Sequence, residues 1–122
     1  MPIPTLKMVE LGSGGFSANP IAVAEGIERL EFDYGLDSNN DGSPDTYSIC
    51  SPCTAAQWND VVAVRINLLA RNSERSFGYS DLKTYAMGLA GSASAPSAAL
   101  NYKRHVFQVL ARLSNKSIRR EQ

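Results

Sequence analysis

Alternation of apolar and polar residues is clearest in two stretches of the chain, residues 27–36 and 61–71. In the first stretch the even-numbered positions from 30 onward are apolar or aromatic, and positions 29, 31 and 33 are charged. In the second stretch an apolar set of side chains shares one face: Val62, Val64, Ile66, Leu68 and Ala70. The polar side chains of Arg65, Asn67 and Arg71 share the other face. A period of two predicts strands with one face toward a core and one toward water.

Shorter stretches follow the same pattern less cleanly. We expect further strands at residues 5–11, 46–49, 82–87 and 102–113, and a small-residue loop at residues 88–97. In the last strand one face is apolar, and the other mixes Arg104, Gln108 and Arg112 with Val106 and Leu110. The connections are too short or too irregular for parallel βαβ crossovers, which predicts a mainly antiparallel sheet.

Two short helices are predicted beside this sheet. Residues 21–26 follow Asn19 as an N-cap and Pro20 as a first helical residue, and Gly26 fits a helix stop. Residues 55–59 follow Thr54 as a cap, with Trp58 as the apolar anchor. Neither helix is long enough to cover the apolar face of the sheet. We therefore expect one α+β, mainly β domain over residues 1–122, in which either the sheet folds on itself or a missing helix packs on it. The second alternative would make the chain a fragment.

Charge excludes some partners. Twelve basic residues balance twelve acidic residues, so the net basic face of a nucleic-acid-binding protein is missing. Residues 25–60 are acidic and residues 103–120 are basic, which predicts a dipolar surface that steers a partner. No apolar run approaches the ~20 residues of a membrane helix, and no signal peptide is visible.

The loop between residues 36 and 46 is the densest cluster of oxygen ligands in the chain. Its candidate ligands have the spacing of positions one, three, five, seven and nine of a calcium-binding loop: Asp37, Asn39, Asp41, Ser43 (through its carbonyl) and Asp45. Position twelve is Ser48 and no helices flank the loop, so it is not an EF-hand. Two interpretations stay open, a Ca²⁺ site and a solvated hairpin loop, because Asp, Asn, Gly and Pro favour turns without any metal.

The two cysteines, Cys50 and Cys53, follow a predicted strand and precede a predicted helix. A structural disulfide that clamps the turn is the interpretation we favour, and it would place the protein in an oxidising compartment. Thiol redox catalysis would need a βαβ framework that the chain does not supply, and zinc would need two more ligands. Free thiols are the remaining alternative.

Nothing else in the sequence points to an enzyme. His105 is the single histidine, and no cysteine or serine motif is tied to it. The Gly-rich residues 12–15 lack the Lys-Ser/Thr of a phosphate loop. The acidic residues Glu25, Glu28, Glu31 and Asp33 are interpreted as a solvated strand edge. We therefore expect no catalytic residue.

Three segments together resemble the PilW family of type IV pilus minor pilins. They are EGIERLEFDYG at residues 25–35 with the Asp/Asn/Gly loop and Asp45-Thr46-Tyr47 after it, Trp58 before VVAVRINLL, and the stretch that begins YKRHVF. The resemblance covers about residues 20–115. The related J-type pseudopilins of type II secretion share this layout.

The resemblance implies a pilin-like sheet that packs on an N-terminal hydrophobic helix, which this chain lacks. It implies a structural role: priming or capping a pilus together with other minor pilins and the major pilin, with membrane attachment through that helix alone. The implied location is the inner membrane with a periplasmic domain, then the extracellular pilus that serves adhesion and twitching motility. Two alternatives stay open, a pseudopilin at the tip of a secretion pseudopilus and a calcium-dependent adhesin or binding module.

Overall fold

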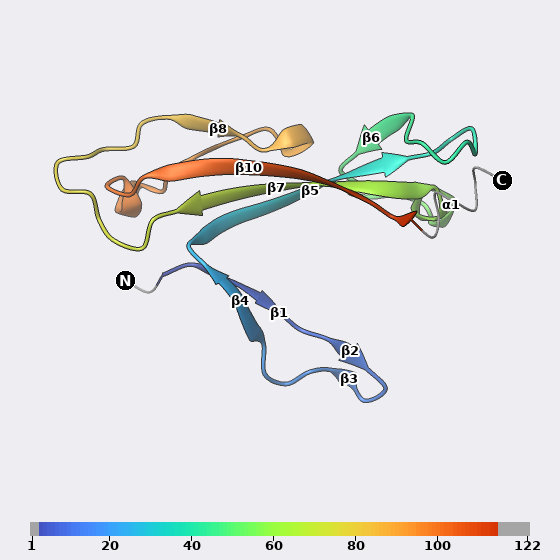
Figure 1. Ribbon diagram of the computed structural model, residues 1–122, viewed down its shortest axis with the longest axis horizontal. Helices are drawn as coiled ribbons and strands as arrows, with labels where there is room; N and C mark the ends of the chain where they lie inside the picture. The colour runs from blue at the N-terminus through green and yellow to red at the C-terminus, as the bar shows by residue number, and fades with distance from the viewer. Residues whose placement is uncertain (1–2, 115–122) are drawn as a thin grey trace.

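The computed structural model describes residues 3–114, and the fold is built almost entirely from antiparallel strands (Figure 1). The fold class predicted from the sequence is therefore confirmed. The elements in chain order are β1 (Thr5–Met8), β2 (Leu11–Gly12), β3 (Gly15–Phe16), β4 (Ile21–Glu25), β5 (Ile27–Leu36), β6 (Thr46–Ser48), α1 (Ala55–Asn59), β7 (Val61–Arg71), β8 (Thr84–Ala86), η1 (Gly88–Ala90), β9 (Ser92–Ser94), η2 (Ser97–Ala99) and β10 (Arg104–Arg112).

The central sheet has the strand order β10-β7-β5-β6, with every pair antiparallel. The two strongest strands of the sequence pattern, β5 and β7, lie side by side in its middle. β6 returns from the acidic loop and pairs with the last three residues of β5, as the hairpin prediction required. Helix α1 also forms where predicted, with a capping box between Thr54 and Gln57.

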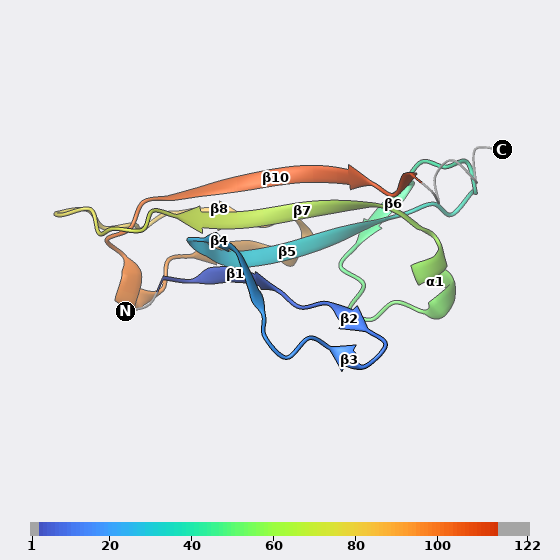
Figure 2. The same ribbon diagram turned by 60° about the horizontal axis from the view of Figure 1, so that its bottom comes forward.

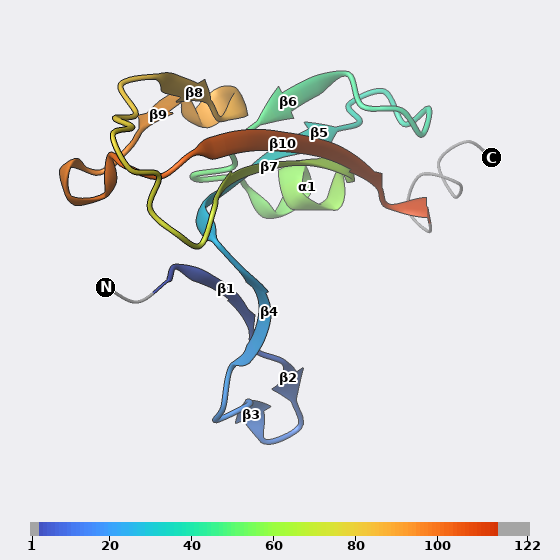
Figure 3. The same ribbon diagram turned by 60° about the vertical axis from the view of Figure 1, so that its left-hand side comes forward.

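The predicted helix at residues 21–26 is wrong. Those residues form β4, which pairs with β1 to make a two-stranded arm, and the tip of the arm is the small β2–β3 hairpin. The segment has only five residues, and pairing with β1 satisfies the backbone that one isolated helical turn would leave largely unbonded. Gly26 has φ +82° and ends the strand instead of a helix; its amide donates to the Pro4 carbonyl. Figures 2 and 3 show this arm leaving the sheet.

Residues 88–97 are likewise not a plain loop. They contain η1, β9 and the start of η2, and β9 pairs with β8. Ala93 of β9 and Met87 are buried and pack with Leu69 of β7 in the hydrophobic core cluster. Small residues permit this because a strand without bulky side chains fits closely over the sheet.

The two faces of the central sheet differ in an unexpected way. Residues 64, 66, 68 and 70 of β7 face the same side as residues 30, 32 and 34 of β5 and the odd-numbered β10 residues. Val62, near α1, is fully buried and is not counted with them. This side, which we call the open face, consists of Leu30, Phe32, Tyr34, Val64, Ile66, Leu68, Ala70, His105, Phe107, Val109 and Ala111, each half-buried or exposed. The opposite side, the covered face, lies under β8, η1 and β9. Figure 3 shows these elements on one side of the sheet and α1 on the other.

The prediction that the polar side of β7 faces water is therefore wrong, because Asn67 and Arg71 are buried on the covered face. Across residues 3–114, no helix is long and apolar enough to span a membrane. The expectation of a single domain stays a prediction.

Candidate functional site

The acidic loop joins β5 to β6 and is tied to the sheet at both ends. The Asp37 amide donates to the Asp60 carbonyl and the Asp45 amide to the Leu36 carbonyl, both at 2.8 Å. Asp37 itself is 1% exposed, although it carries a carboxylate. That carboxylate accepts hydrogen bonds from the amides of Asp41 at 3.1 Å and Gly42 at 2.9 Å. The loop therefore closes around its first acidic residue.

The five predicted ligands hold this loop together through their own backbone and side chains. Asp45 Oδ2 accepts from the amide and hydroxyl of Ser38 at 2.8 and 3.0 Å and from the Asn39 amide at 3.3 Å. Asp41 Oδ1 accepts from the Ser43 amide at 2.9 Å. Asn39 and Ser43 thus contribute amide donors to the other predicted ligands, and both residues are exposed.

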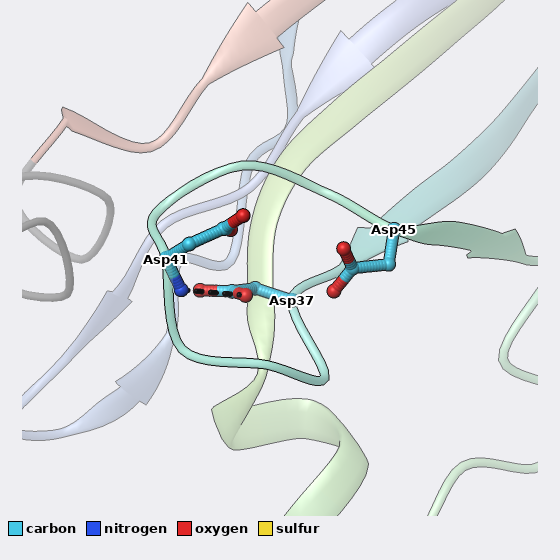
Figure 4. Close-up of side chains that lie close together, drawn as sticks. All are labelled: Asp37, Asp41 and Asp45. Atoms are coloured by element: carbon cyan, nitrogen blue, oxygen red, sulfur yellow. Dashed lines mark hydrogen bonds between the residues drawn. The ribbon is translucent and has the colours of Figure 1, made fainter.

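Three of the predicted ligands converge. One carboxylate oxygen each from Asp37, Asp41 and Asp45 lies within 4.8 Å of the others, and Figure 4 shows Asp37 between the other two. Oxygens that bind one Ca²⁺ at about 2.4 Å lie no more than about 4.8 Å apart, so the spacing is compatible with that ion. Exposed carboxylates also gather in loops without a metal, so the two interpretations of the sequence both stand.

The cysteine prediction is confirmed as a disulfide. Cys50 and Cys53 are bonded, with their Cα atoms 4.5 Å apart, in the turn between β6 and α1. Neither cysteine is available as a thiol. Beyond the bond, Trp58 of α1 stacks edge-on against Tyr34 at 4.9 Å between ring centroids, which anchors the helix to the open face.

A polar network on the covered face was missed by the sequence analysis. Asp33 is fully buried and accepts from Arg65 Nε at 2.8 Å, Asn67 Nδ2 at 3.2 Å and the Leu89 amide at 3.1 Å. Burial by itself raises the pKa of Asp33, but these hydrogen bonds outweigh it and the pKa lies below its usual value. Gly88 makes the close approach possible, since a Cβ there would collide with the Asp33 carboxylate.

A second buried network lies at the end of the sheet where the arm begins. Arg104 donates to Glu28 through Nε and, at 3.0 Å, through a terminal nitrogen, and to Asp81 at 3.1 Å. Tyr85 donates to Asp81 at 2.7 Å. Burial and this bond to Asp81 raise the pKa of Tyr85 to about 12. The pKa of Asp81 is lowered, because bonds from Tyr85, the Lys83 amide and Arg104 outweigh the effect of burial.

These networks correct the interpretation of Glu28 and Asp33 as a solvated strand edge. The signal that could have found them is the shared parity of opposite charges on neighbouring strands. Asp33 lies directly opposite Arg65 in the β5–β7 register, whereas Arg104 lies opposite Arg71, a like charge, so this signal identifies only the first network. Charges that face each other between paired strands are candidates for burial as ion pairs.

The open face carries several exposed apolar side chains on adjacent strands. Phe32 is 37% exposed, and Phe107 and Val109 of β10 are 50% and 54% exposed. A contiguous apolar surface of this kind often marks a site where another segment or protein packs. The sequence analysis predicted an uncovered apolar face, and a covering helix outside this chain stays a prediction.

Comparisons with known proteins give one match. A family model described as PilW, type IV pilus-assembly protein W, matches residues 2–115. No curated protein and no solved structure matches the chain.

Proposed function

Because this chain belongs to the PilW family of type IV pilus-assembly proteins, we propose that it is a minor pilin that primes or caps the pilus. The family connects the chain with pilus assembly and with the periplasm or the pilus as its location. The finer proposal is a structural role: the domain associates with other minor pilins and with the major pilin. In the same proposal a hydrophobic helix supplies the membrane anchor.

The open face is the observation that supports this proposal best. It is apolar along three adjacent strands, and α1 reaches it at one end through Trp58. A long helix with one apolar stripe would bury this surface, and each large side chain removed from water would contribute about 1.5–3 kcal/mol. The resemblance to pilins implies such a helix, and a sheet open on this side is what a pilin domain without it would present.

Complementation in a piliated strain tests the proposal. Deletion of the gene is expected to reduce surface pili, and the wild-type gene to restore them. Phe32→Asp puts a charge on the open face and is expected to fail, whereas Leu82→Asp puts the same charge on an 82% exposed residue outside it and is expected to succeed. Normal pili in the deletion strain would overturn the assembly role, and full rescue by Phe32→Asp would overturn the role of the open face.

Association with the other minor pilins is tested separately by co-purification from membranes. The wild-type protein is expected to retain them and the Phe32→Asp variant to lose them, with the Leu82→Asp variant as the matched control. Retention of every partner by Phe32→Asp would show that the open face does not support assembly.

A calcium-stabilised loop is the second candidate, favoured by the three converging carboxylates. In this proposal Ca²⁺ neutralises Asp37, Asp41 and Asp45 and fixes the hairpin tip, where a calcium-dependent contact could form. Calorimetry with CaCl₂ is expected to show binding that Asp41→Ala removes and that the control Glu74→Ala, in an exposed loop, retains. No heat at millimolar CaCl₂ would leave the solvated hairpin loop as the explanation.

We propose no enzymatic activity. The cysteines are joined in a disulfide beside a helix of five residues, and the buried carboxylates are engaged by Arg65 and Arg104. Turnover in an insulin-reduction assay, absent from a Cys50→Ala variant, would contradict this.

A further inference from the structure

A cavity of about 360 Å³ lies where the arm joins the central sheet. Two charged residues border it, Glu28 near the start of β5 and Arg71 at the end of β7. Its other lining residues are apolar and come from the chain before β1 and from the region of η2: Ile3, Pro4, Pro96, Ala98 and Ala99. This volume is in the range of small-ligand sites, about 300–1,000 Å³. The assembly role proposed above does not involve this cavity.

Backbone hydrogen bonds fix the walls of the cavity. The Gly26 amide donates to the Pro4 carbonyl and the Arg71 amide to the Gly26 carbonyl, both at 2.7 Å. On the η2 side, the Ala99 amide donates to the Pro96 carbonyl at 2.9 Å. The cavity is therefore largely pre-formed, as sites for small ligands usually are.

Arg71 is buried at this cavity with a hydrogen-bond donor that has no acceptor. Its side chain is 2% exposed, and its Nε atom has no hydrogen-bond partner within residues 3–114. Glu28 Oε2 lies 3.6 Å from Arg71 Nη1, which is beyond hydrogen-bond distance. The guanidinium stacks on the Tyr102 ring at 3.9 Å, and this contact orients it without providing an acceptor. Because buried donors are nearly always hydrogen-bonded, the arrangement points to an acceptor that comes from outside the domain.

The charges around the cavity already balance, and this determines the charge of the ligand. Arg104 donates to both carboxylate oxygens of Glu28 and also to Asp81. Together with Arg71, the group holds two arginines and two carboxylates. A carboxylate or ammonium group on the ligand would add a buried charge without a counter-charge, which is costly. The ligand that fits is therefore uncharged, with an oxygen that accepts a hydrogen bond.

We propose that this cavity binds an uncharged carbonyl compound of the amide type that carries a small apolar group. The carbonyl oxygen accepts a hydrogen bond from the Arg71 guanidinium, and the apolar group packs against Pro4, Pro96 and Ala98. A free small amide and an apolar peptide segment share this chemistry. The proposal goes beyond the assembly role and does not depend on it.

Titration of the isotope-labelled chain with N-acetyl-leucine methylamide, followed by NMR, tests the proposal. This probe has two uncharged carbonyls and one apolar side chain. At millimolar concentration it is expected to give saturable shifts at the backbone amides of Glu28 and Ala98 and at the Arg71 Nε–H signal. The absence of saturable shifts would leave water as the content of the cavity and overturn the proposal. Saturation without a shift of the Arg71 signal would overturn the hydrogen bond to the carbonyl.

Two further probes define the class of ligand. Free N-acetyl-leucine, which carries a carboxylate, is expected to bind about tenfold more weakly than the methylamide. Equal or tighter binding of this acid would overturn the uncharged ligand. A capped peptide with one leucine between two alanines distinguishes the two sources: tighter binding than the methylamide supports a peptide segment, and equal or weaker binding supports a small amide.

A matched pair of variants locates the site. Ala98 is exposed where it lines the cavity, so Ala98→Trp is expected to fold and to weaken binding about tenfold, because the indole occupies the space. Ala55→Trp changes an exposed residue of α1 and is expected to bind normally. Undiminished binding in Ala98→Trp would place the probe elsewhere and overturn the site. Arg71→Leu removes the donors and is expected to abolish binding; if it does not fold, the Arg71 signal and Ala98→Trp decide. Because these experiments use the purified chain and small probes, their failure is distinct from a failure to complement piliation.

Discussion

The open face and the covered face of the central sheet reverse what their composition predicts. The covered face buries charged and amide side chains, Asp33 and Asn67 among them, whereas the open face leaves Ile66, Phe107 and Val109 partly in water. The difference is one of partners. On the covered face Asp33 and Asn67 meet polar partners on neighbouring strands and on η1, which offsets the cost of burying them. On the open face the apolar residues have no cover within residues 3–114 except α1 at one end.

The two faces contribute differently to the stability of the domain. The covered face holds specific contacts that depend on geometry and ionisation, and it stabilises the domain as it stands. The open face exposes apolar surface to water. This surface would contribute to the stability of the domain only when another segment packs on it and buries it. The predictions below test this division.

The largest effect is expected from Asp33→Ala. Removing this buried carboxylate leaves Arg65, Asn67 and the Leu89 amide without their acceptor, which typically costs about 3–5 kcal/mol in unfolding free energy. Urea unfolding measures the change. The matched control on the other face, Val109→Ala, is expected to cost less than about 1 kcal/mol, because Val109 is more than half exposed. Equal losses in the two variants would show that the faces do not differ as described.

Acid is expected to weaken the covered face next. The pKa values of Asp33 and Asp81 are lowered in the folded state, from a usual value of 3.8, so the unfolded chain takes up protons first as the pH falls. Their contribution is therefore full well above pH 3.8 and is lost as the pH falls through the lowered values. Urea midpoints between neutral pH and strong acid measure this, and Asp33→Asn is expected to flatten the dependence. An unchanged dependence in that variant would contradict the role of Asp33.

Alkali provides the opposite test at Tyr85. Its pKa is raised from 10.0 to about 12 in the folded state, so its contribution is full below pH 10 and is lost as the pH rises toward 12. Absorbance of the tyrosinate in wild type and in Tyr85→Phe identifies this group. Titration of Tyr85 near pH 10 in the folded protein would show that its bond to Asp81 is not maintained.

A smaller effect is expected at α1, the short helix on the open face. Thr54→Ala removes the side-chain half of the capping box and is expected to cost about 1 kcal/mol. Thr54→Ser keeps the hydroxyl and is the control. The fluorescence of Trp58 reports whether the helix still lies against Tyr34.

The smallest effect on stability is expected from Phe107→Thr on the open face. Phe107 is 50% exposed and threonine suits a strand, so the unfolding free energy is expected to change by less than about 1 kcal/mol. Binding of a hydrophobic dye to the domain should nevertheless fall. A loss as large as that of Asp33→Ala would mean that Phe107 is core.

The sequence predicted the elements that local patterns determine. Alternation identified β5 and β7, and Thr54 as a cap with Trp58 as an anchor identified α1. It did not predict β4, because Asn19-Pro20 and Gly26 fit the ends of a helix as well as those of a strand. Pairing with β1, a tertiary contact, decides between the two.

The candidate site was predictable to the same extent. The acidic loop and the disulfide lie within single short segments, so their spacing is visible in the sequence. The covered-face network is not, since Asp33 and Arg65 are 32 residues apart and meet only through the register of β5 and β7. The face of β7 that is buried is also determined by β8, η1 and β9, which pack over it. Their small residues give no hydrophobic pattern from which this packing could be predicted.

The arm made by β1 and β4 has a mechanical consequence. Thr5 and Glu25 pair at its base, so a pull on the chain before Thr5 loads the hydrogen bonds of this ladder one at a time, starting from the base. The central sheet is loaded only after the arm has opened. Once opened, the 21 residues from Thr5 to Glu25 would extend to a length of about 70 Å. A pull on the chain before Thr5 would therefore extend the arm before it unfolds the central sheet.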